Sequence, residues 1–223
     1  MKAVKITFEG SNVNNDINDI VTKLHRKKDD CPFGVALPAL SCGEKKCSLG
    51  NVLIVYLRKD ECFENLKGFL RGKRYVMEVR DLKELIKENP KYMIFKKSNY
   101  ISKFTLANAK YVIKAVKNGK VKEENLREID KTIFEEYRKA KSDTEEEKIF
   151  IALEKTKKKL RNKYRFPFMR IESVSSIKKG NEYPYKMFNV EKYDFQGIIN
   201  SFDFERFNSY GLSKKEPQPV PLF

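Results

Sequence analysis

The sequence predicts an α+β protein that begins with a βαββαβ order of elements. Three observations predict this class: alternating apolar and polar residues at the N-terminus, an amphipathic helical pattern directly after them, and two apolar, β-branched runs separated by a loop. The chain has 223 residues, of which 40% are hydrophobic, so it is long enough to bury a core. The usual solution of this order is ferredoxin-like, an antiparallel sheet with both helices on one face.

Each N-terminal element follows from a short pattern. Residues 2–8 alternate with the period of a half-buried strand. From Ile17 to Leu24 apolar residues recur at i, i+3, i+4 and i+7, which predicts a helix with His25 at the edge of its apolar face. The remaining elements are expected as strands at 33–37 and 52–57, a short helix at 62–70 and a strand at 75–79. We expect this domain to span residues 1–97.

A second domain, with a basic helix and short strands, is expected over residues 98–223. Its first helix covers residues 106–117 and carries Lys110, Lys114 and Lys117 on a face apart from its apolar residues. That helix therefore presents positive charge to its surroundings.

The rest of this domain combines helices and strands. Two further amphipathic helices are expected at 126–137 and 144–160, and Thr144-x-x-Glu147 offers a capping box for the second. Beyond Phe166 the composition is aromatic and typical of strands, up to a proline-rich tail that cannot be helical.

The charge of the chain indicates a polyanionic partner. There are 47 Lys and Arg against 31 Asp and Glu, a net charge of +16. Each phosphate that a basic protein neutralises releases condensed counterions, so nucleic acid is the natural partner. Seven basic residues and no acid occur from Lys155 to Arg165, which strengthens this reading against a general lysine bias.

The location is expected to be the cytoplasm, with no membrane contact. No stretch approaches the ~20 apolar residues of a membrane span, and the N-terminus has the pattern of a strand rather than of a signal peptide.

Four cysteines lie in the first third of the chain: Cys31, Cys42, Cys47 and Cys62. The Cys42-x4-Cys47 spacing is looser than that of a zinc knuckle, and no histidine follows within ligand distance. We expect reduced, structural thiols and no metal.

A single histidine limits the possible chemistry. One imidazole excludes mechanisms that pair two of them as acid and base, and two-histidine metal sites. Base catalysis near neutral pH must then centre on His25 or on a perturbed lysine or carboxylate, while the simpler alternative is a structural histidine. A metal nuclease would need clustered carboxylates, and Asp203 with Glu205 on one strand face is the best available pair, without a third partner.

Three separated segments resemble one family. They are Thr22-Lys23-Leu24-His25 with Phe33-Gly34-Val35-Ala36-Leu37-Pro38, the strand Phe166-Pro167-Phe168-Met169-Arg170-Ile171-Glu172-Ser173-Val174-Ser175-Ser176, and Ser209-Tyr210-Gly211-Leu212-Ser213-Lys214 with the closing Pro221-Leu222-Phe223. The chain is similar in these places to the CRISPR repeat endoribonucleases of subtype I-F, the Csy-four or Cas-six-f family. The segments cover about a quarter of the chain, and the C-terminal one is the most specific.

The resemblance implies a hydrolase-class nuclease that processes CRISPR RNA without metal or cofactor. His25 would take the proton from the ribose 2′-hydroxyl that attacks the adjacent phosphodiester, Ser173 would position that hydroxyl, and Tyr210 would orient the histidine. An unperturbed imidazole with a pKa of about 6.5 suits this role.

The resemblance also implies how a repeat hairpin is bound. Lys110, Lys114 and Lys117 occupy the helix that the family inserts into the major groove, and lysine keeps the charge of arginine without its bidentate fork. Lys103 and Thr105 stand where the family reads bases of the lower stem. Further RNA contacts are implied for Ser175, Ser176, Phe223 and Tyr185, which would stack on the terminal base pair, with Tyr183 as the alternative.

The implied partners are CRISPR repeat hairpin RNA and other subunits of a type I-F interference complex in antiviral defence. The C-terminal half would then be an RNA-recognition domain, and residues 121–165 an addition to the family pattern. Two alternatives stay open: a subunit that binds the hairpin without cutting it, and an unrelated basic nucleic-acid-binding protein.

Overall fold

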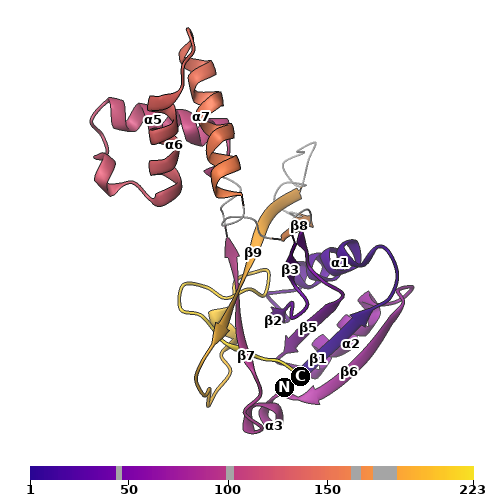
Figure 1. Ribbon diagram of the computed structural model, residues 1–223. Coiled ribbons are helices and arrows are strands. Elements are labelled where there is room, and N and C mark those ends of the chain that lie inside the picture. Colours follow the sequence, from indigo (N-terminus) through magenta and orange to yellow (C-terminus); the bar gives the residue numbers. More distant parts are fainter. Residues whose placement is uncertain (44–46, 99–102, 162–166, 173–184) are drawn as a thin grey trace. The chain divides into compact units, whose positions relative to one another are not determined.

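The computed structural model describes residues 1–43, 47–98, 103–161, 167–172 and 185–223 (Figure 1). Its α+β class confirms the expected one. The elements are β1 (Lys2–Phe8), α1 (Val13–Arg26), β2 (Phe33–Ala36), β3 (Ser41–Cys42), β4 (Cys47–Ser48), β5 (Val52–Leu57), α2 (Asp60–Phe69), β6 (Tyr75–Asp81), α3 (Leu82–Lys87), β7 (Tyr92–Ser98), α5 (Leu106–Lys117), α6 (Glu128–Lys139), α7 (Glu145–Leu160), β8 (Phe168–Glu172), β9 (Tyr185–Phe195) and β10 (Val220–Pro221).

The chain forms two compact units. The larger one combines Met1–Ser98 with Phe166–Phe223, and the smaller one is Asn99–Arg165. The first boundary lies within one residue of the expected one, at residue 97, but the C-terminal segment belongs to the first unit and not, as expected, to the second. The reason is long-range strand pairing, in which β9 pairs with β7 and β10 pairs with β7 on its other side.

The first sheet contains the predicted N-terminal strands. Its order is β2-β5-β1-β6, with every neighbouring pair antiparallel. Alternation along β1 buries Val4, Ile6 and Phe8, and α1 adds Ile17, Ile20, Val21 and Leu24 to the same core. The apolar face of the strand, which repeats every two residues, therefore packs against the apolar face of the helix, which repeats every 3.6 residues.

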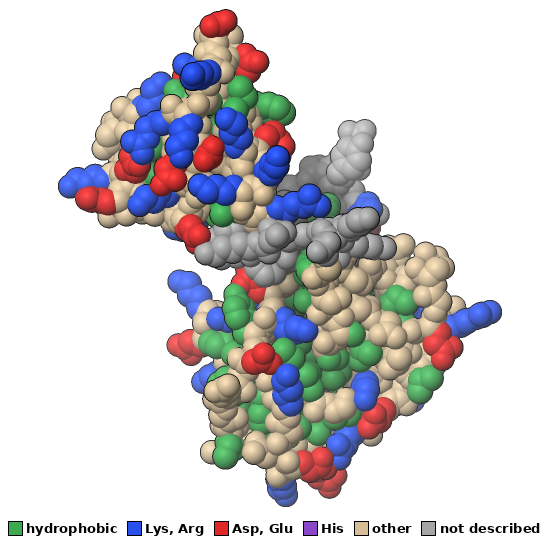
Figure 2. Space-filling model, in the orientation of Figure 1, with side chains coloured by type: hydrophobic (Ala, Val, Ile, Leu, Met, Phe, Trp, Pro, Cys, Tyr) green, Lys and Arg blue, Asp and Glu red, His purple; other side chains and the backbone are tan. Residues whose placement is uncertain are grey.

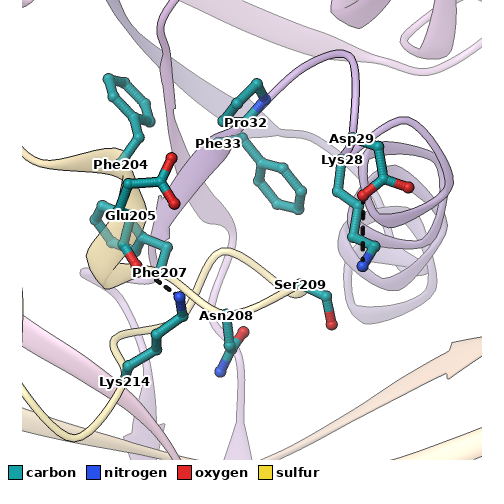
Figure 3. A pocket seen from close by; sticks show the side chains of 10 residues that line it. All are labelled: Lys28, Asp29, Pro32, Phe33, Phe204, Glu205, Phe207, Asn208, Ser209 and Lys214. Carbon is teal, nitrogen blue, oxygen red and sulfur yellow. Dashed lines mark hydrogen bonds and ion pairs between the residues drawn. The ribbon is translucent and has the colours of Figure 1, made fainter.

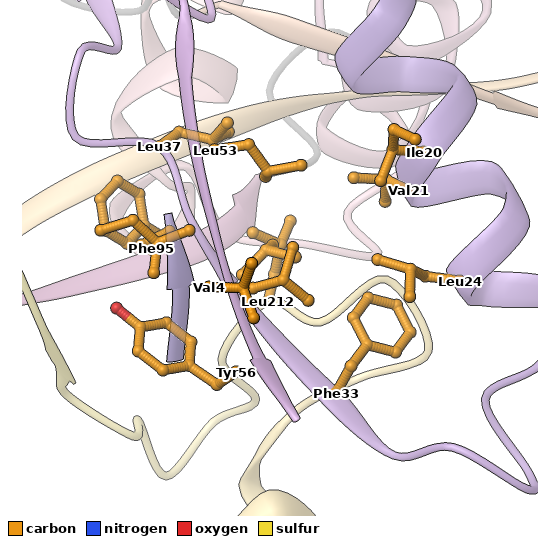
Figure 4. Close-up of a cluster of buried hydrophobic side chains, with 14 of the residues drawn as sticks. Val4, Ile20, Val21, Leu24, Phe33, Leu37, Leu53, Tyr56, Phe95 and Leu212 are labelled. Carbon is orange, nitrogen blue, oxygen red and sulfur yellow. The ribbon is translucent and has the colours of Figure 1, made fainter. Parts of the chain in front are cut away.

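A second sheet, of order β10-β7-β9-β8, shares that core. Phe95 of β7 and Leu212 of the C-terminal segment lie among the side chains of the first sheet (Figure 4). The C-terminal segment is thus part of the body that carries His25.

The smaller unit is a helical bundle. Helices α5, α6 and α7 confirm the three predicted amphipathic helices, and they enclose Ala109, Ile113, Ile133, Phe134 and Leu153. The Thr144 side chain accepts from Glu147 N (3.3 Å), as a capping residue does.

The cysteines form two disulfides, Cys31–Cys62 and Cys42–Cys47, so the expectation of reduced thiols is wrong for this structure. The spacing did not reveal them because the fold creates both pairs. Cys31 follows α1 and Cys62 lies in α2, which packs against α1, while Cys42 and Cys47 are opposite each other in the β3–β4 hairpin.

Within the described residues, none of the helices has the length and apolar character of a membrane span.

Candidate functional site

His25 lies in the last turn of α1 and is half-buried. Its Nδ1 is 2.7 Å from the carbonyl oxygen of Ser209, 184 residues further along the chain. Because a carbonyl can only accept, Nδ1 carries a proton and donates it. In the neutral imidazole, Nε2 is then left with a free lone pair, which is the state a general base requires.

A tight turn fixes that carbonyl. The Asn208 side-chain oxygen accepts from Tyr210 N (2.8 Å) and from Leu212 N (3.3 Å), and Gly211 N donates to Asn208 O (2.9 Å). Val35 N of β2 donates to Gly211 O (2.8 Å), which anchors the turn to the edge of the first sheet. The sheet thus holds the partner of His25 in place.

Gly211 is needed for this turn for two reasons. Its φ is +73°, and an added Cβ would lie 2.6 Å from a ring carbon of Phe33. We expect Gly211→Ala to lower the free energy of unfolding by about 3 kcal/mol, from backbone strain and the clash together. The matched control is Gly72→Ala, where φ is +79° with open space around it, and only about 1 kcal/mol should be lost. Urea denaturation checks both, and equal losses would contradict the clash with Phe33.

Tyr210 packs against the imidazole. The two ring centroids are 4.7 Å apart with the planes inclined by 28°, and Phe188 of β9 lies 4.7 Å from Tyr210. Lys97 Nζ lies 5.3 Å from the Tyr210 centroid and 5.1 Å from that of Phe188. Burial lowers the pKa of Lys97, and Lys186 lowers it further. The His25 side chain therefore contacts the Ser209 carbonyl and the Tyr210 ring, and Lys97 lies against the rings of Tyr210 and Phe188.

The pKa of His25 is lowered from 6.5. Burial is the main cause, the Ser209 carbonyl opposes it, and Lys28 and Lys186 lower the pKa further, while Asp29 raises it. At neutral pH the imidazole is therefore uncharged, and the nearby lysines favour this neutral form.

The single histidine allows a direct test of this pKa. We expect an NMR titration of the His25 ring to give a value below 6.5, and Lys186→Gln to raise it because a repelling charge is removed. Because the folded pKa is depressed, the unfolded chain binds more protons in this range, so this group's contribution to stability falls as pH drops through the folded pKa. Lys83→Gln, in α3 of the same unit and not among the charges that act on His25, is the control and should leave the titration unchanged. A midpoint above 6.5 in the native protein would contradict this environment.

Ser173 lies outside the described residues, as do Ser175, Ser176 and Tyr183. Glu172, the last residue of β8, pairs with Arg26, directly after His25. Arg170 N of the same strand donates to Asn18 of α1 (3.2 Å). Strand β8 thus packs along α1, and its last residue pairs with the chain neighbour of His25.

The other predicted contacts of the larger unit lie elsewhere. Tyr185 is the first residue of β9, and its side chain is outside the described part. Phe223 is half-buried, with Lys5 Nζ 5.5 Å and the Arg80 guanidinium 5.8 Å from its ring centre. No contact of Phe223 with His25 is observed among the described residues.

The expected strand at Asp203 and Glu205 is wrong. Phe204–Arg206 is a single 3₁₀ turn, and the Asp203 side chain caps it by accepting from Glu205 N (2.8 Å). The Asp203 carboxylate therefore caps this turn. Within the described residues, no group of three or more His, Cys, Asp and Glu side chains is placed to hold a metal ion.

In the smaller unit, α5 carries the predicted lysines on one side. Lys110 pairs with Glu146 (2.5 Å) and Lys117 with Glu145 (3.0 Å), both from the first turn of α7, while Lys114 is exposed. The basic helix therefore lies against acidic side chains of its own unit.

The predicted base-reading pair precedes α5. Thr105 is the N-cap, accepting from Asn108 N (3.2 Å), and the Lys103 carbonyl accepts from the Asn108 amide (3.2 Å). The Thr105 hydroxyl already has a structural role.

Several groups around His25 were not predicted: Ser209, Asn208, Phe188, Lys97, Lys186 and Lys28. The Asn208-Ser209-Tyr210-Gly211 run is a recognisable turn signal, since asparagine and glycine favour tight turns. The lysines carry no such local signal.

Comparison with known proteins identifies no family: no family model matches the sequence, and no curated protein matches it.

Proposed function

We propose that this protein is a metal-independent endoribonuclease that cuts precursor CRISPR RNA at the 3′ base of each repeat hairpin, with His25 as the general base. The observation that carries the proposal is the seating of His25 on the Ser209-Tyr210 turn, where Nδ1 donates to the Ser209 carbonyl and the lone pair of the neutral imidazole is on Nε2. The resemblance to subtype I-F endoribonucleases implies a tyrosine that orients the histidine, and Tyr210 stacks on the His25 ring.

The reaction needs one base and an aligned internal nucleophile. Nε2 of His25 takes the proton of the 2′-hydroxyl, and the oxygen attacks the adjacent phosphorus. The bond to the 5′-oxygen of the next nucleotide breaks, and that oxygen takes up a proton. The products are a 2′,3′-cyclic phosphate and a 5′-hydroxyl, and Ser173 would position the nucleophile.

Basic groups near His25 favour this chemistry. Lys28 and Lys186 act on the imidazole through their charges, and Lys97 Nζ lies 5.3 Å from the centre of the Tyr210 ring. Positive charge already in place stabilises the negative charge that builds on the phosphate in the transition state. It also keeps His25 neutral between turnovers.

We propose that the β2-β5-β1-β6 sheet with α1 and α2 is a ferredoxin-like catalytic domain, and that RNA recognition involves α5 and the C-terminal strands. The pairs of Lys110 and Lys117 are exposed, and such pairs contribute little, so phosphates can replace the carboxylates. Tight binding through charge would keep the cut RNA in place as part of an interference complex.

We place the protein in the cytoplasm, where precursor RNA is made.

The experiment that tests the proposal is incubation of the purified protein with a hairpin RNA of the repeat from its own genomic neighbourhood, in EDTA. We expect one cut, a 2′,3′-cyclic phosphate on the upstream product, and no cut when the nucleotide before the scissile bond is 2′-deoxy. Tight binding without cleavage would instead make the protein a hairpin-binding subunit. Equal affinity for duplex DNA would favour an unrelated basic nucleic-acid-binding protein.

A further inference from the structure

One face of the second sheet ends in two lysines. Alternation along β9 places Lys186, Phe188 and Val190 on the same face, and Lys97 of β7 lies opposite Val190 in the register. Phe188 and Val190 are buried in the core that α1 shares, whereas both lysines are exposed. The lysines therefore lie at the margin of the face that is turned toward the helix of His25.

These lysines belong to the surroundings of the candidate site. The Lys97 ammonium group lies 5.1 Å from the ring centre of Phe188 and 5.3 Å from that of Tyr210, the ring that stacks on His25. Phe188 stands between the two lysines along β9, so Lys97 points toward Lys186. Lys186 in turn acts on His25 through its charge. One cation thus reaches the Tyr210 ring, and the other acts on the imidazole that stacks on it.

Neither lysine has an acidic partner among the residues that the structure describes. Burial lowers the pKa of Lys97 and the charge of Lys186 lowers it further, which shows that the two ammonium groups repel each other. Ile171 of β8 lies opposite Lys186 in the register, and the carboxylate of the next residue, Glu172, pairs with Arg26 instead. The repulsion between the lysines is therefore not offset within the described part of the chain.

Lys28 shows the contrasting arrangement. It also lowers the pKa of His25, but its ammonium group pairs with the Asp29 carboxylate (3.7 Å), as drawn in Figure 3. A lysine that already has a carboxylate beside it gains less from a second anion. Two neighbouring lysines without one gain more, because an anion placed between them replaces a repulsion by two attractions.

We propose that Lys97 and Lys186 together form a phosphate site that binds one backbone phosphate of the RNA; that the ligand is RNA rests on the proposed function. A phosphodiester shares one negative charge between two non-bridging oxygens, so each oxygen can accept from one of the ammonium groups. The bound phosphate also fixes the RNA strand relative to the Tyr210 and His25 rings, and attack by an internal nucleophile depends on such alignment.

The first measurement uses inorganic phosphate alone, at constant ionic strength, with each protein at the midpoint of its own His25 titration. Phosphate should shift the NMR signals of the His25 ring toward the protonated form, because the anion offsets the charge of Lys186. The response should saturate in the native protein. It should be lost when Lys97→Gln and Lys186→Gln are combined, and kept when both lysines are replaced by arginine, which retains the charges.

Lys96→Gln is the matched control for this measurement. Lys96 precedes Lys97 on β7, so its side chain lies on the other face of the sheet. This variant loses one positive charge and should still respond to phosphate as the native protein does. A response that the double glutamine variant retains would overturn the site.

The second measurement asks which phosphate of the RNA is bound. Hairpin RNAs made uncleavable by a 2′-deoxy nucleotide carry one uncharged methylphosphonate each, placed in turn at every phosphate around the cut. We expect the native protein to bind one of them about tenfold more weakly than the unmodified RNA. The double glutamine variant should bind the unmodified RNA more weakly to at least that extent, with no further loss on that one modified RNA, because both changes remove the same contact.

The outcomes separate the phosphate site from the proposed function. A further loss by the double glutamine variant on every modified RNA would mean that the lysines bind none of these phosphates, and it would overturn the assignment to RNA even where inorganic phosphate binds. Absence of any cleavage of the unblocked RNA by the native protein would overturn the proposed function, while the response to inorganic phosphate stood.

Discussion

Replacing His25 with alanine should abolish cleavage of the hairpin RNA and leave its affinity unchanged. The substitution removes Nε2, the group proposed to accept the 2′-hydroxyl proton, and general base catalysis contributes about 10²–10⁴-fold. Binding should persist because it depends on many lysines and arginines away from the imidazole. The single-turnover cleavage rate and the Kd for a 2′-deoxy substrate, both in EDTA, check the two parts.

His25→Asn is the matched control for a structural role. Its side-chain amide can donate to the Ser209 carbonyl as Nδ1 does, but it has no basic nitrogen. We expect this variant to be as inactive as His25→Ala while keeping more of the native stability. Cleavage at the native rate by either variant would remove His25 from the mechanism, and cleavage that EDTA abolishes would point to metal and carboxylate chemistry.

The local elements could be predicted from the sequence, whereas the assembly of the larger unit could not. Apolar periodicity is a property of neighbouring residues, so it predicted β1, α1 and the three helices of the smaller unit. The pairing of β7 with β9 joins segments about a hundred residues apart, with Phe95 opposite Lys192 in the register. Nothing in either segment specifies that partner, and for this reason the C-terminal segment was assigned to the second domain instead of the first.

The residues of the candidate site also include some that the sequence could predict and some that it could not. The resemblance indicated His25 and Tyr210, and the structure places them in contact. The carbonyl of Ser209 could not be predicted, because a backbone acceptor has no side-chain signature. Lys97 and Lys186 were equally hidden, since a chain with 47 basic residues offers many lysines. Only the fold of β7 and β9 brings Lys97 to the Tyr210 ring and Lys186 close enough to act on His25.

Affinity for the hairpin should fall by about 10³–10⁵ between roughly 50 and 200 mM salt, since such a loss accompanies the neutralisation of some 6–10 phosphates. The smaller unit should account for much of this response. Its sequence has 19 basic and 11 acidic residues, so its net charge is +8. Lys and Arg side chains spread over its visible surface with carboxylates among them (Figure 2). A flat response to salt would contradict binding through phosphates.

The lysines of α5 allow that response to be located. A variant that combines Lys110→Gln, Lys114→Gln and Lys117→Gln should have a shallower slope of log affinity against log salt concentration. The slope should fall by about three, one for each lost phosphate contact. The same number of charges removed at Lys83, Lys87 and Lys91 of the larger unit is the control, and it should change the slope less. Conversely, Glu145→Gln with Glu146→Gln should tighten binding, because those carboxylates compete with phosphate for Lys110 and Lys117. Equal slopes for the α5 variant and its control would mean that net charge alone, and no particular helix, binds the RNA.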